Sequence, residues 1–316
     1  MIKAKIDKLF GTIKNFFKRT TGGDDSAKDI TYSSQSHNTL FEKIPLERAL
    51  ENVEFTESEC KIPIIIGYDD ENNLLVDNLS RTPHILVGGA TGSGKSIFLQ
   101  NIIASLVTKF TADEIKLVLF DLKRVEFEYD KELPHLKGKV VNNIDDAIRT
   151  LQELVDIMDD RRRAINGLGI VGSLSRRGTN CLEKYNAFTG KQLPYIAVVI
   201  DEYAELVMQS DIVKELIYDL ALHGHSAGIH LILASQRASD EIFPSDLKAI
   251  ASTRAVCRVA SQEDSWTMLT HLGAEKLPHT FGEMLYSSIW LGAGKPIKIK
   301  VPYISEKKSI ELVRKD

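Results

Sequence analysis

The stretch HILVGGATGSGKSIFLQ, residues 84–100, decides how the core of this chain folds. Residues 85–88 are apolar and predict a buried strand, whereas apolar residues recur at helical spacing over 96–107. A glycine-rich turn joins them and ends in Lys95 and Ser96. The pattern therefore predicts a strand, a tight turn and a helix in direct succession.

The turn fits the phosphate-binding pattern G-x-x-x-x-G-K-[ST], and the flanking strand and helix supply the context that the pattern requires. Glycine adopts positive φ, so successive backbone N–H groups can converge on phosphate oxygens, and the helix N-terminus adds a positive dipole end. We expect Lys95 to reach the β/γ-phosphates of ATP and the Ser96 hydroxyl to coordinate Mg²⁺. The predicted nucleotide-binding residues are Gly89, Ala90, Thr91, Gly92, Ser93, Gly94, Lys95, Ser96 and Ile97.

Length and composition indicate a globular protein. The chain has 316 residues, 43% of them hydrophobic and 27% charged, which is enough for one large core or a core with a small accessory domain. Three widely spaced cysteines predict no disulfide framework and fit a reducing cytoplasm. No apolar run is long enough to predict a transmembrane helix. The net charge of −4 argues against a basic coat for nucleic acid, but it leaves room for a local basic lining.

Residues 1–20 predict a basic amphipathic helix. Its apolar residues are Ile2, Ile6, Leu9, Phe10, Ile13, Phe16 and Phe17, and its basic residues are Lys3, Lys5, Lys8, Lys14, Lys18 and Arg19. Two interpretations stay open: the helix lies in an anionic membrane interface, at the inner face of the membrane, or it docks on the main domain or a partner subunit. Residues 21–38 are polar and rich in Gly and Ser, which predicts a flexible linker.

From about residue 39 the pattern predicts a parallel sheet covered by helices on both faces, because continuous apolar strands alternate with helical segments. The expected strands are 62–67, 85–88, 116–121, 195–201, 230–235, 254–259, 283–286 and 297–301. The expected helices include 96–109, 144–166 and 211–223.

The run YIAVVIDEYAEL, residues 195–206, supplies the carboxylates that hydrolysis of a nucleotide needs. Asp201 ends an apolar strand and is expected to reach Mg²⁺, directly or through water. Glu202 follows it and is the predicted general base. Gln236 ends the apolar strand in LILASQR and is the predicted sensor of the γ-phosphate.

These motifs belong to a series of blocks that resembles the motor domain of the FtsK/SpoIIIE DNA translocases, within the HerA/FtsK-like P-loop ATPases. The blocks are PHILVGGATGSGKS (83–96), DLKRVEF (121–127), LPHL (133–136), YIAVVIDEYAEL (195–206), AGIHLILASQRAS (227–239), STRAVCRVASQEDSWTML (252–269) and LGAEKLPHTFGEMLY (272–286). They stand in the family's order, which makes the resemblance specific. The family commonly has arginine where His225 and Trp266 stand here.

The resemblance implies a RecA-like P-loop NTPase core with a mostly parallel central sheet flanked by helices. It also implies a hexameric ring that hydrolyses ATP at subunit interfaces and moves double-stranded DNA. The expected divisions are the basic helix (1–20), the linker (21–38), a small α/β subdomain (39–80), the motor domain (81–304) and a helical tail (305–316). The expected form is compact, without transmembrane helices or a C-terminal winged-helix module.

The resemblance also suggests residues for contacts outside the ATP site. Lys248, which matches a family lysine, is a candidate DNA contact, and His225, Arg176 and Arg177 are further candidates. Arg254 is expected either to act on a neighbouring subunit's ATP or to pin the sheet edge. Lys123 and Arg124 are candidates for a subunit interface.

Three functions compete at this stage. The favoured hypothesis is a DNA motor serving a plasmid, conjugative element or phage in transfer, packaging or segregation. The alternative from another class is an ATPase of the same family that powers protein secretion. A nucleotide-dependent scaffold with little hydrolysis is the third hypothesis, and the presence of both Asp201 and Glu202 argues against it.

Overall fold

A computed structural model describes residues 44–124, 127, 133–168, 181–278, 282–291 and 295–303. Its strands are β1 (Pro63–Tyr68), β2 (Leu74–Asn78), β3 (His84–Gly88), β4 (Ile115–Phe120), β5 (Tyr195–Ile200), β6 (Ile229–Ser235), β7 (Thr253–Val256), β8 (Glu283–Ser287) and β9 (Ile297–Lys300). The predicted helix at 1–20, linker at 21–38 and tail at 305–316 lie outside the described residues.

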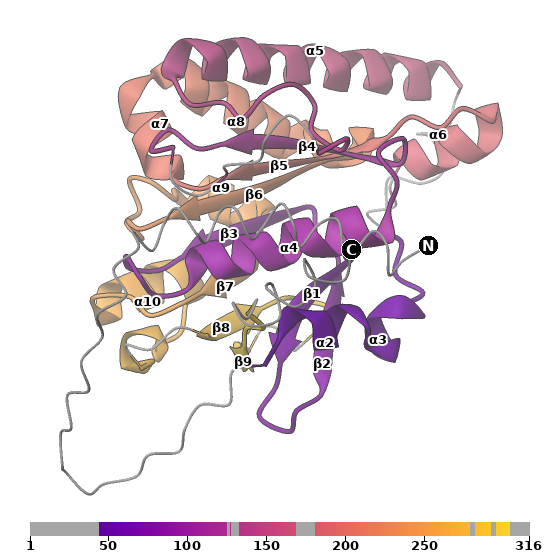
Figure 1. The fold of residues 1–316 in the computed structure, drawn as a ribbon. Coiled ribbons are helices and arrows are strands. Elements are labelled where there is room, and N and C mark those ends of the chain that lie inside the picture. The colour runs from indigo at the N-terminus through magenta and orange to yellow at the C-terminus, as the bar shows by residue number, and fades with distance from the viewer. Residues whose placement is uncertain are drawn as a thin grey trace, which may run out of the picture.

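Helices connect these strands and cover the sheet (Figure 1). They are α2 (Leu46–Leu50), α3 (Val53–Thr56), α4 (Lys95–Lys109), α5 (Ile144–Gly167), α6 (Cys181–Thr189), α7 (Tyr203–Gln209), α8 (Asp211–His223), α9 (Ser245–Ile250) and α10 (Gln262–Leu269), with short 3-10 turns η1 (Gly224–Ala227) and η2 (Ala274–Lys276). The three helices predicted from sequence are present with bounds that differ by at most one residue.

One nine-stranded sheet runs through the molecule in the order β2-β1-β9-β8-β7-β3-β6-β5-β4. From β7 to β4 the neighbouring strands are parallel, and from β2 to β7 they are antiparallel. The parallel half confirms the expected α/β core. The predicted boundary between a small subdomain at 39–80 and a motor domain stays a prediction, and β1 and β2 join the same sheet as the motor strands.

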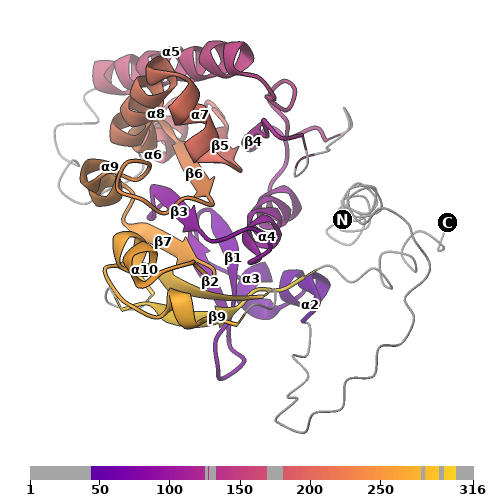
Figure 2. The same cartoon turned by 90° about the vertical axis from the view of Figure 1, so that its left-hand side faces the viewer.

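Both faces of the parallel half are buried, as its apolar sequences predict. Side chains of consecutive residues in a strand point to opposite faces. Ile85 and Val87 of β3 accordingly belong to one core cluster with α4, whereas Leu86 belongs to the other with α5 and α8. Figure 2 shows α4 on one side of β3 and α8 on the other. The sheet therefore holds its carboxyl edge between two packed layers.

Two sequence-based strand predictions differ from the structure. The strand expected at 254–259 ends at Val256, because the residues that follow bond to the phosphate-binding turn. Cys257 N–H donates to the Gly88 carbonyl, and the Arg258 carbonyl accepts from Ala90 N–H. Strand β2 was missed since it is short and follows a polar turn. That turn is closed by Asp69 N–H donating to the Asn73 carbonyl at 3.1 Å.

Gly67 of β1 lies close to the neighbouring strand β9 in the antiparallel half. It has φ +151, the register of β1 against β2 shifts beside it, and a Cβ there would lie 2.6 Å from the Lys300 carbonyl oxygen. We expect Gly67→Ala to lower the free energy of unfolding by about 2–3 kcal/mol, because the methyl group strains φ and pushes β9 away. Urea denaturation measures this.

Gly167→Ala is the matched control, since no atom lies within 4 Å of its Cβ position. Its effect should stay within about 1 kcal/mol of wild type. Equal effects of the two substitutions would contradict the packing argument at Gly67.

Candidate functional site

The phosphate-binding turn has the backbone that its sequence predicts. Between β3 and α4, Gly89, Gly92 and Gly94 have φ of +155, +72 and +110, a region that favours glycine. A Cβ at Gly89 would lie 2.6 Å from Ser93 Oγ and 2.8 Å from Cys257 Cβ. The loop is therefore folded tightly on itself and on the segment after β7, so that any side chain at this position would distort it.

The start of α4 is ready to accept phosphate. Gly94 is its N-cap and provides no side-chain hydrogen bond, so the first-turn N–H groups have no side-chain acceptor. Lys95 begins the helix and is 6% exposed. Orphan N–H donors, the helix dipole and a buried ammonium group together form an anion site. The residues present therefore fit the phosphates of ATP, and coordination of Mg²⁺ by Ser96 and Asp201 stays a prediction.

Cys257 lies under the loop and stays a neutral thiol. Burial raises the pKa of the Cys257 thiol to about 12, against a smaller lowering by the nearby Lys95 ammonium. A neutral thiol leaves the positive charge of Lys95 available for phosphate oxygens. The sequence contained no signal for this contact, because Cys257 and Lys95 lie far apart in the chain.

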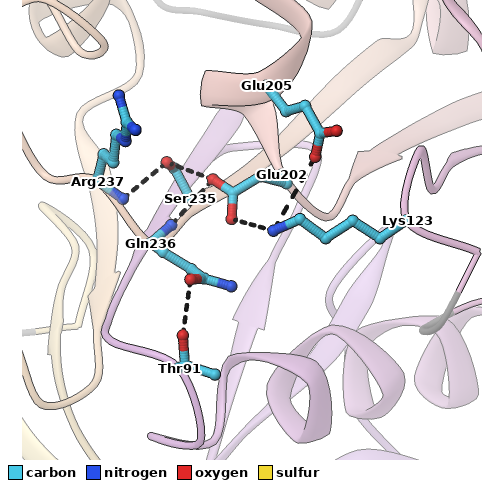
Figure 3. Close-up of polar contacts among 7 residues, drawn as sticks. All are labelled: Thr91, Lys123, Glu202, Glu205, Ser235, Gln236 and Arg237. Atoms are coloured by element: carbon cyan, nitrogen blue, oxygen red, sulfur yellow. Dashed lines mark hydrogen bonds and ion pairs between the residues drawn. The ribbon is translucent and has the colours of Figure 1, made fainter.

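Glu202, the predicted base, is held by donors from two other segments (Figure 3). Its Oε1 accepts from Ser235 Oγ at 2.8 Å and from Gln236 N–H at 3.1 Å, and its Oε2 accepts from Lys123 Nζ at 3.3 Å. A carboxylate has about four lone-pair sites, so these bonds leave room for one more donor. That remaining position is where a water molecule could bind.

Gln236 connects the phosphate-binding turn to Glu202. Thr91 Oγ1 in the turn donates to Gln236 Oε1 at 2.7 Å, while the Gln236 N–H donates to Glu202. Figure 3 shows Gln236 between the other two residues. The geometry follows from the sheet, in which β6 lies between β3 and β5. Ser235 was missed by sequence reasoning, although it is the neighbour of Gln236 in the same motif.

Asp201 lies beside Glu202 at the end of β5. It is 8% exposed, and its N–H donates to the Phe120 carbonyl of β4 at 3.2 Å. The carboxyl ends of β3, β5 and β6 therefore bring the turn, Asp201, Glu202 and Gln236 to one edge of the sheet. The roles assigned to these residues remain predictions.

The interface candidates divide between two places. Lys123 is in the site of its own chain, 3.3 Å from Glu202 Oε2 and 4.0 Å from Glu205 Oε2. Arg124 has a positive φ of 57, and its guanidinium lies 3.4 Å from Asn142 Oδ1. Lys123 therefore has a contact in cis that the sequence did not suggest, and an interface role for either residue stays a prediction.

Arg254 and Lys248 lie together at another place. The Arg254 guanidinium donates to the carbonyls of Met268 at 2.9 Å and Lys248 at 2.8 Å, and burial lowers its pKa. Lys248 is 14% exposed and forms an ion pair with Asp240. These contacts tie Arg254 to α9 and α10 in the interior of the sheet, because β7 is its middle strand and not an edge strand. A role of Arg254 on a neighbouring subunit's ATP stays a prediction. Arg176 and Arg177 lie outside the described residues.

His225 lies at the amino edge of the parallel strands, away from the phosphate-binding turn. Its ring is 5.7 Å from that of His230, and His84 completes the group. Burial first, and the neighbouring His225 second, lower the pKa of His84 to about 3 and hold that of His230 well below its usual value. Within the described residues no cluster of three or more His, Cys, Asp or Glu side chains is arranged to hold a metal ion.

Gly89→Ala tests the anion site. The added methyl group cannot fit between Ser93 and Cys257, so we expect ATP affinity to fall by more than about tenfold. Gly167→Ala at the end of α5 is the control, because it lies outside the turn and its Cβ would meet no atom within 4 Å. Titration with a fluorescent ATP analogue measures both, and circular dichroism checks folding. An unchanged affinity in Gly89→Ala would contradict the described loop.

His84→Gln tests the buried histidines. His84 is neutral when folded and takes up a proton in the unfolded chain below pH of about 6.5, so its contribution to stability is lost as pH falls from there toward its folded pKa. Glutamine can keep hydrogen bonds to the Ala221 carbonyl and the Leu231 N–H, and it does not titrate. The pH dependence of the free energy of unfolding should become shallower, by up to about 1.4 kcal/mol per pH unit.

Urea denaturation between about pH 7 and about pH 5 supplies the comparison. His223→Gln makes the same substitution at an exposed histidine of α8 and is the control for replacing a histidine by glutamine. Parallel slopes for wild type and His84→Gln would show that His84 is not the buried neutral group described.

Comparisons with known proteins agree with this geometry. A sequence model of the FtsK/SpoIIIE family matches residues 45–240. The chain is 35% identical over 274 residues to the DNA translocase FtsK of Listeria monocytogenes, covering 83% of this chain and 35% of that protein. It is 32% identical over 298 residues to the DNA translocase SftA of Bacillus subtilis, covering 89% and 30%. The chain spans about a third of the length of these relatives.

Solved structures show the same fold. The conjugation coupling protein TcpA of pCW3, solved as a monomer with ATPγS, superposes with a TM-score of 0.69 at 24% identity, over 86% of this chain and 73% of that one. The cytoplasmic domain of the Type VII secretion ATPase EccC from Thermomonospora curvata has a TM-score of 0.65 at 25% identity, over 78% and 29%. Within the described residues no helix is long and apolar enough to cross a bilayer. The chain belongs to the FtsK/SpoIIIE family, and its core is a P-loop ATPase fold.

Proposed function

We propose that this chain is the motor domain of an ATP-driven translocase of double-stranded DNA that works as a hexameric ring. Family membership and two DNA translocases among the relatives support the choice of cargo. The observation that best supports a motor is the chain of hydrogen bonds from Thr91 through Gln236 to Glu202. It links the nucleotide-binding turn to the proposed catalytic carboxylate.

ATP hydrolysis needs few parts, and this chain has them in one place. Loop N–H groups and Lys95 hold the phosphates, and Glu202 accepts a proton from water as the water oxygen bonds to the γ-phosphorus. The bond from the γ-phosphorus to the bridging oxygen breaks, and ADP and phosphate leave. Ser96 and Asp201 would hold Mg²⁺, which would neutralise part of the phosphate charge. Gln236 senses the γ-phosphate and transmits its presence to Glu202, because Gln236 contacts both Thr91 in the turn and the Glu202 carboxylate.

The ring is proposed with ATP at subunit interfaces. A residue that acts on the neighbour's nucleotide must be free to reach it, and Arg254 is tied to two backbone carbonyls. Arg124 has an exposed side chain on the segment after β4, beside Lys123. Of the proposed interface residues, we therefore favour Arg124 for the role in trans.

DNA is proposed to contact the motor through phosphates, which position a duplex without reading its sequence. Lys248, His225, Arg176 and Arg177 remain the candidates. Lys248 would have to exchange its ion pair with Asp240 for a phosphate. The process served is proposed to be transfer, packaging or segregation of a plasmid, conjugative element or phage genome.

Protein secretion is the second candidate, because EccC, a Type VII secretion ATPase, shares the fold at 25% identity. The chain is expected to work in the cytoplasm. Residues 1–20 are proposed either to contact the inner face of the membrane or to dock on protein.

ATP turnover of the full chain with and without duplex DNA tests the proposal. We expect duplex DNA to stimulate turnover several-fold, single strands to compete poorly, and Lys95→Ala to abolish it. Glu202→Gln should keep ATP affinity and lose about 10²–10⁴-fold in turnover, the range that a general base contributes. A rate of ATP turnover that does not change with DNA would favour protein secretion instead. Loss of ATP binding in Glu202→Gln would refute the role of Glu202 as the general base.

Electron microscopy with duplex DNA and a slowly hydrolysed ATP analogue tests the ring. We expect closed rings with DNA in the channel. A chain that stays monomeric with both ligands would overturn the ring and leave the ATP site standing.

A further inference from the structure

A groove lies between helix α3 and strand β2, apart from the ATP site. Its volume is about 520 Å³, and Leu291, from the segment after β8, is among the residues that line it. Strand β2 ends the sheet, and four strands separate it from β3 and the phosphate-binding turn. The groove therefore takes no part in the chemistry described above.

The groove has an apolar floor and an acidic rim. Leu74, Leu75 and Val76 of β2 line it, together with Val53, whose side chain is 56% exposed. The rim carries the exposed carboxylates of Glu54, Glu57 and Glu59. None of these three glutamates forms an ion pair with a residue that the structure describes.

Among the described residues, no strand pairs with the outer edge of β2. At the other end of the sheet, the segment at 135–141 covers the edge of β4 with backbone hydrogen bonds, such as Leu117 N–H to the His135 carbonyl at 2.8 Å. Strand β2 pairs with β1 alone among the described strands. Native proteins protect the edges of their sheets, and a contiguous exposed apolar patch marks an interaction site. These features are typical of a surface that binds another segment or protein.

We propose that residues 1–20 of the same chain dock in this groove. That segment has the complementary character: Ile, Leu and Phe residues at helical spacing suit the apolar floor, and its lysines suit the unpaired glutamates. Like-charged glutamates spaced along α3 and after it gain from a cationic partner, and the segment carries cations on either side of its apolar residues.

The connection is long enough. Residues 21–43 join the segment to the described chain, and an extended chain spans about 3.3–3.6 Å per residue, so they reach on the order of 75 Å. The groove begins at Val53, shortly after residue 44, where the described chain starts. Tethering also raises the effective concentration of the segment to about the millimolar range, which favours docking within one chain over docking between chains.

The proposal chooses between the two interpretations of the basic helix. An anionic membrane would offer the same combination of apolar depth and negative charge. The described surface favours protein, because it contains a site of matching charge within reach of the tether. Membrane binding becomes an outcome of the test.

The test perturbs each partner and measures the other, in the full chain and without ATP or DNA. Amide hydrogen exchange of residues 1–20, followed by mass spectrometry, should be at least about tenfold slower in wild type than in Glu54→Lys plus Glu57→Lys. Glu215→Lys plus Glu241→Lys makes the same charge change on exposed residues outside the groove. This control should keep the protection.

Cys60 reports the groove from inside, because it is partly buried in the lining. Phe16→Glu plus Phe17→Glu leaves the groove unchanged, so we expect iodoacetamide to alkylate Cys60 at least about threefold faster than in wild type, with the site identified by peptide mass spectrometry. Raised salt should also speed this alkylation in wild type, since charge pairs on a surface are screened.

Three outcomes would overturn the proposal. One is exchange in residues 1–20 that is equally fast in wild type and the groove variant. Another is protection that appears only with anionic vesicles, which would assign the segment to membrane. The third is protection that falls on dilution, which would show docking between chains. Because no nucleotide is present, failure here leaves the proposed motor function untouched.

Discussion

The parallel alignment of β3, β6 and β5 is the constraint on which the site depends. Because β6 lies between the other two strands, the residues at its carboxyl end contact both the phosphate-binding turn and Glu202. A slip of one residue in the pairing of β6 would turn the Ser235 side chain to the other face of the sheet and break both connections. The two core clusters resist such a slip, since each strand places alternate side chains in a different cluster.

Burial of Glu202 explains the rest of the polar network. A carboxylate that is 9% exposed is costly unless hydrogen bonds or a cation compensate its charge. Ser235, Gln236 and Lys123 provide that compensation from two segments. The same bonds fix the orientation of the carboxylate, as the proposed role of general base requires. The stability of the fold and the proposed chemistry therefore depend on the same hydrogen bonds to Glu202, and a change at Ser235 or Lys123 is expected to affect both.

Local motifs were predictable and long-range contacts were not. The turn at 88–95 and the pair Asp201–Glu202 follow apolar runs directly, so their place at a strand end could be inferred from periodicity alone. The hydrogen bond from Ser235 to Glu202 depends on which strands are neighbours, which the sequence does not state. The strand expected at 254–259 was too long for a related reason: its apolar residues continue past Val256, but they pack against the turn instead of a strand.

By itself, the sequence determined the phosphate-binding turn, the pair of carboxylates at the end of a strand, and the resemblance to the FtsK/SpoIIIE family. Each depends on residues that are close in the chain, where glycine conformation and apolar periodicity act directly. The tertiary structure alone decided that Lys123 pairs with Glu202 in cis, that Arg254 is tied to carbonyls, and that no described residue covers the acidic groove beside β2. Those features arise where segments distant in sequence meet, and burial and charge compensation, rather than local preference, select the partners there.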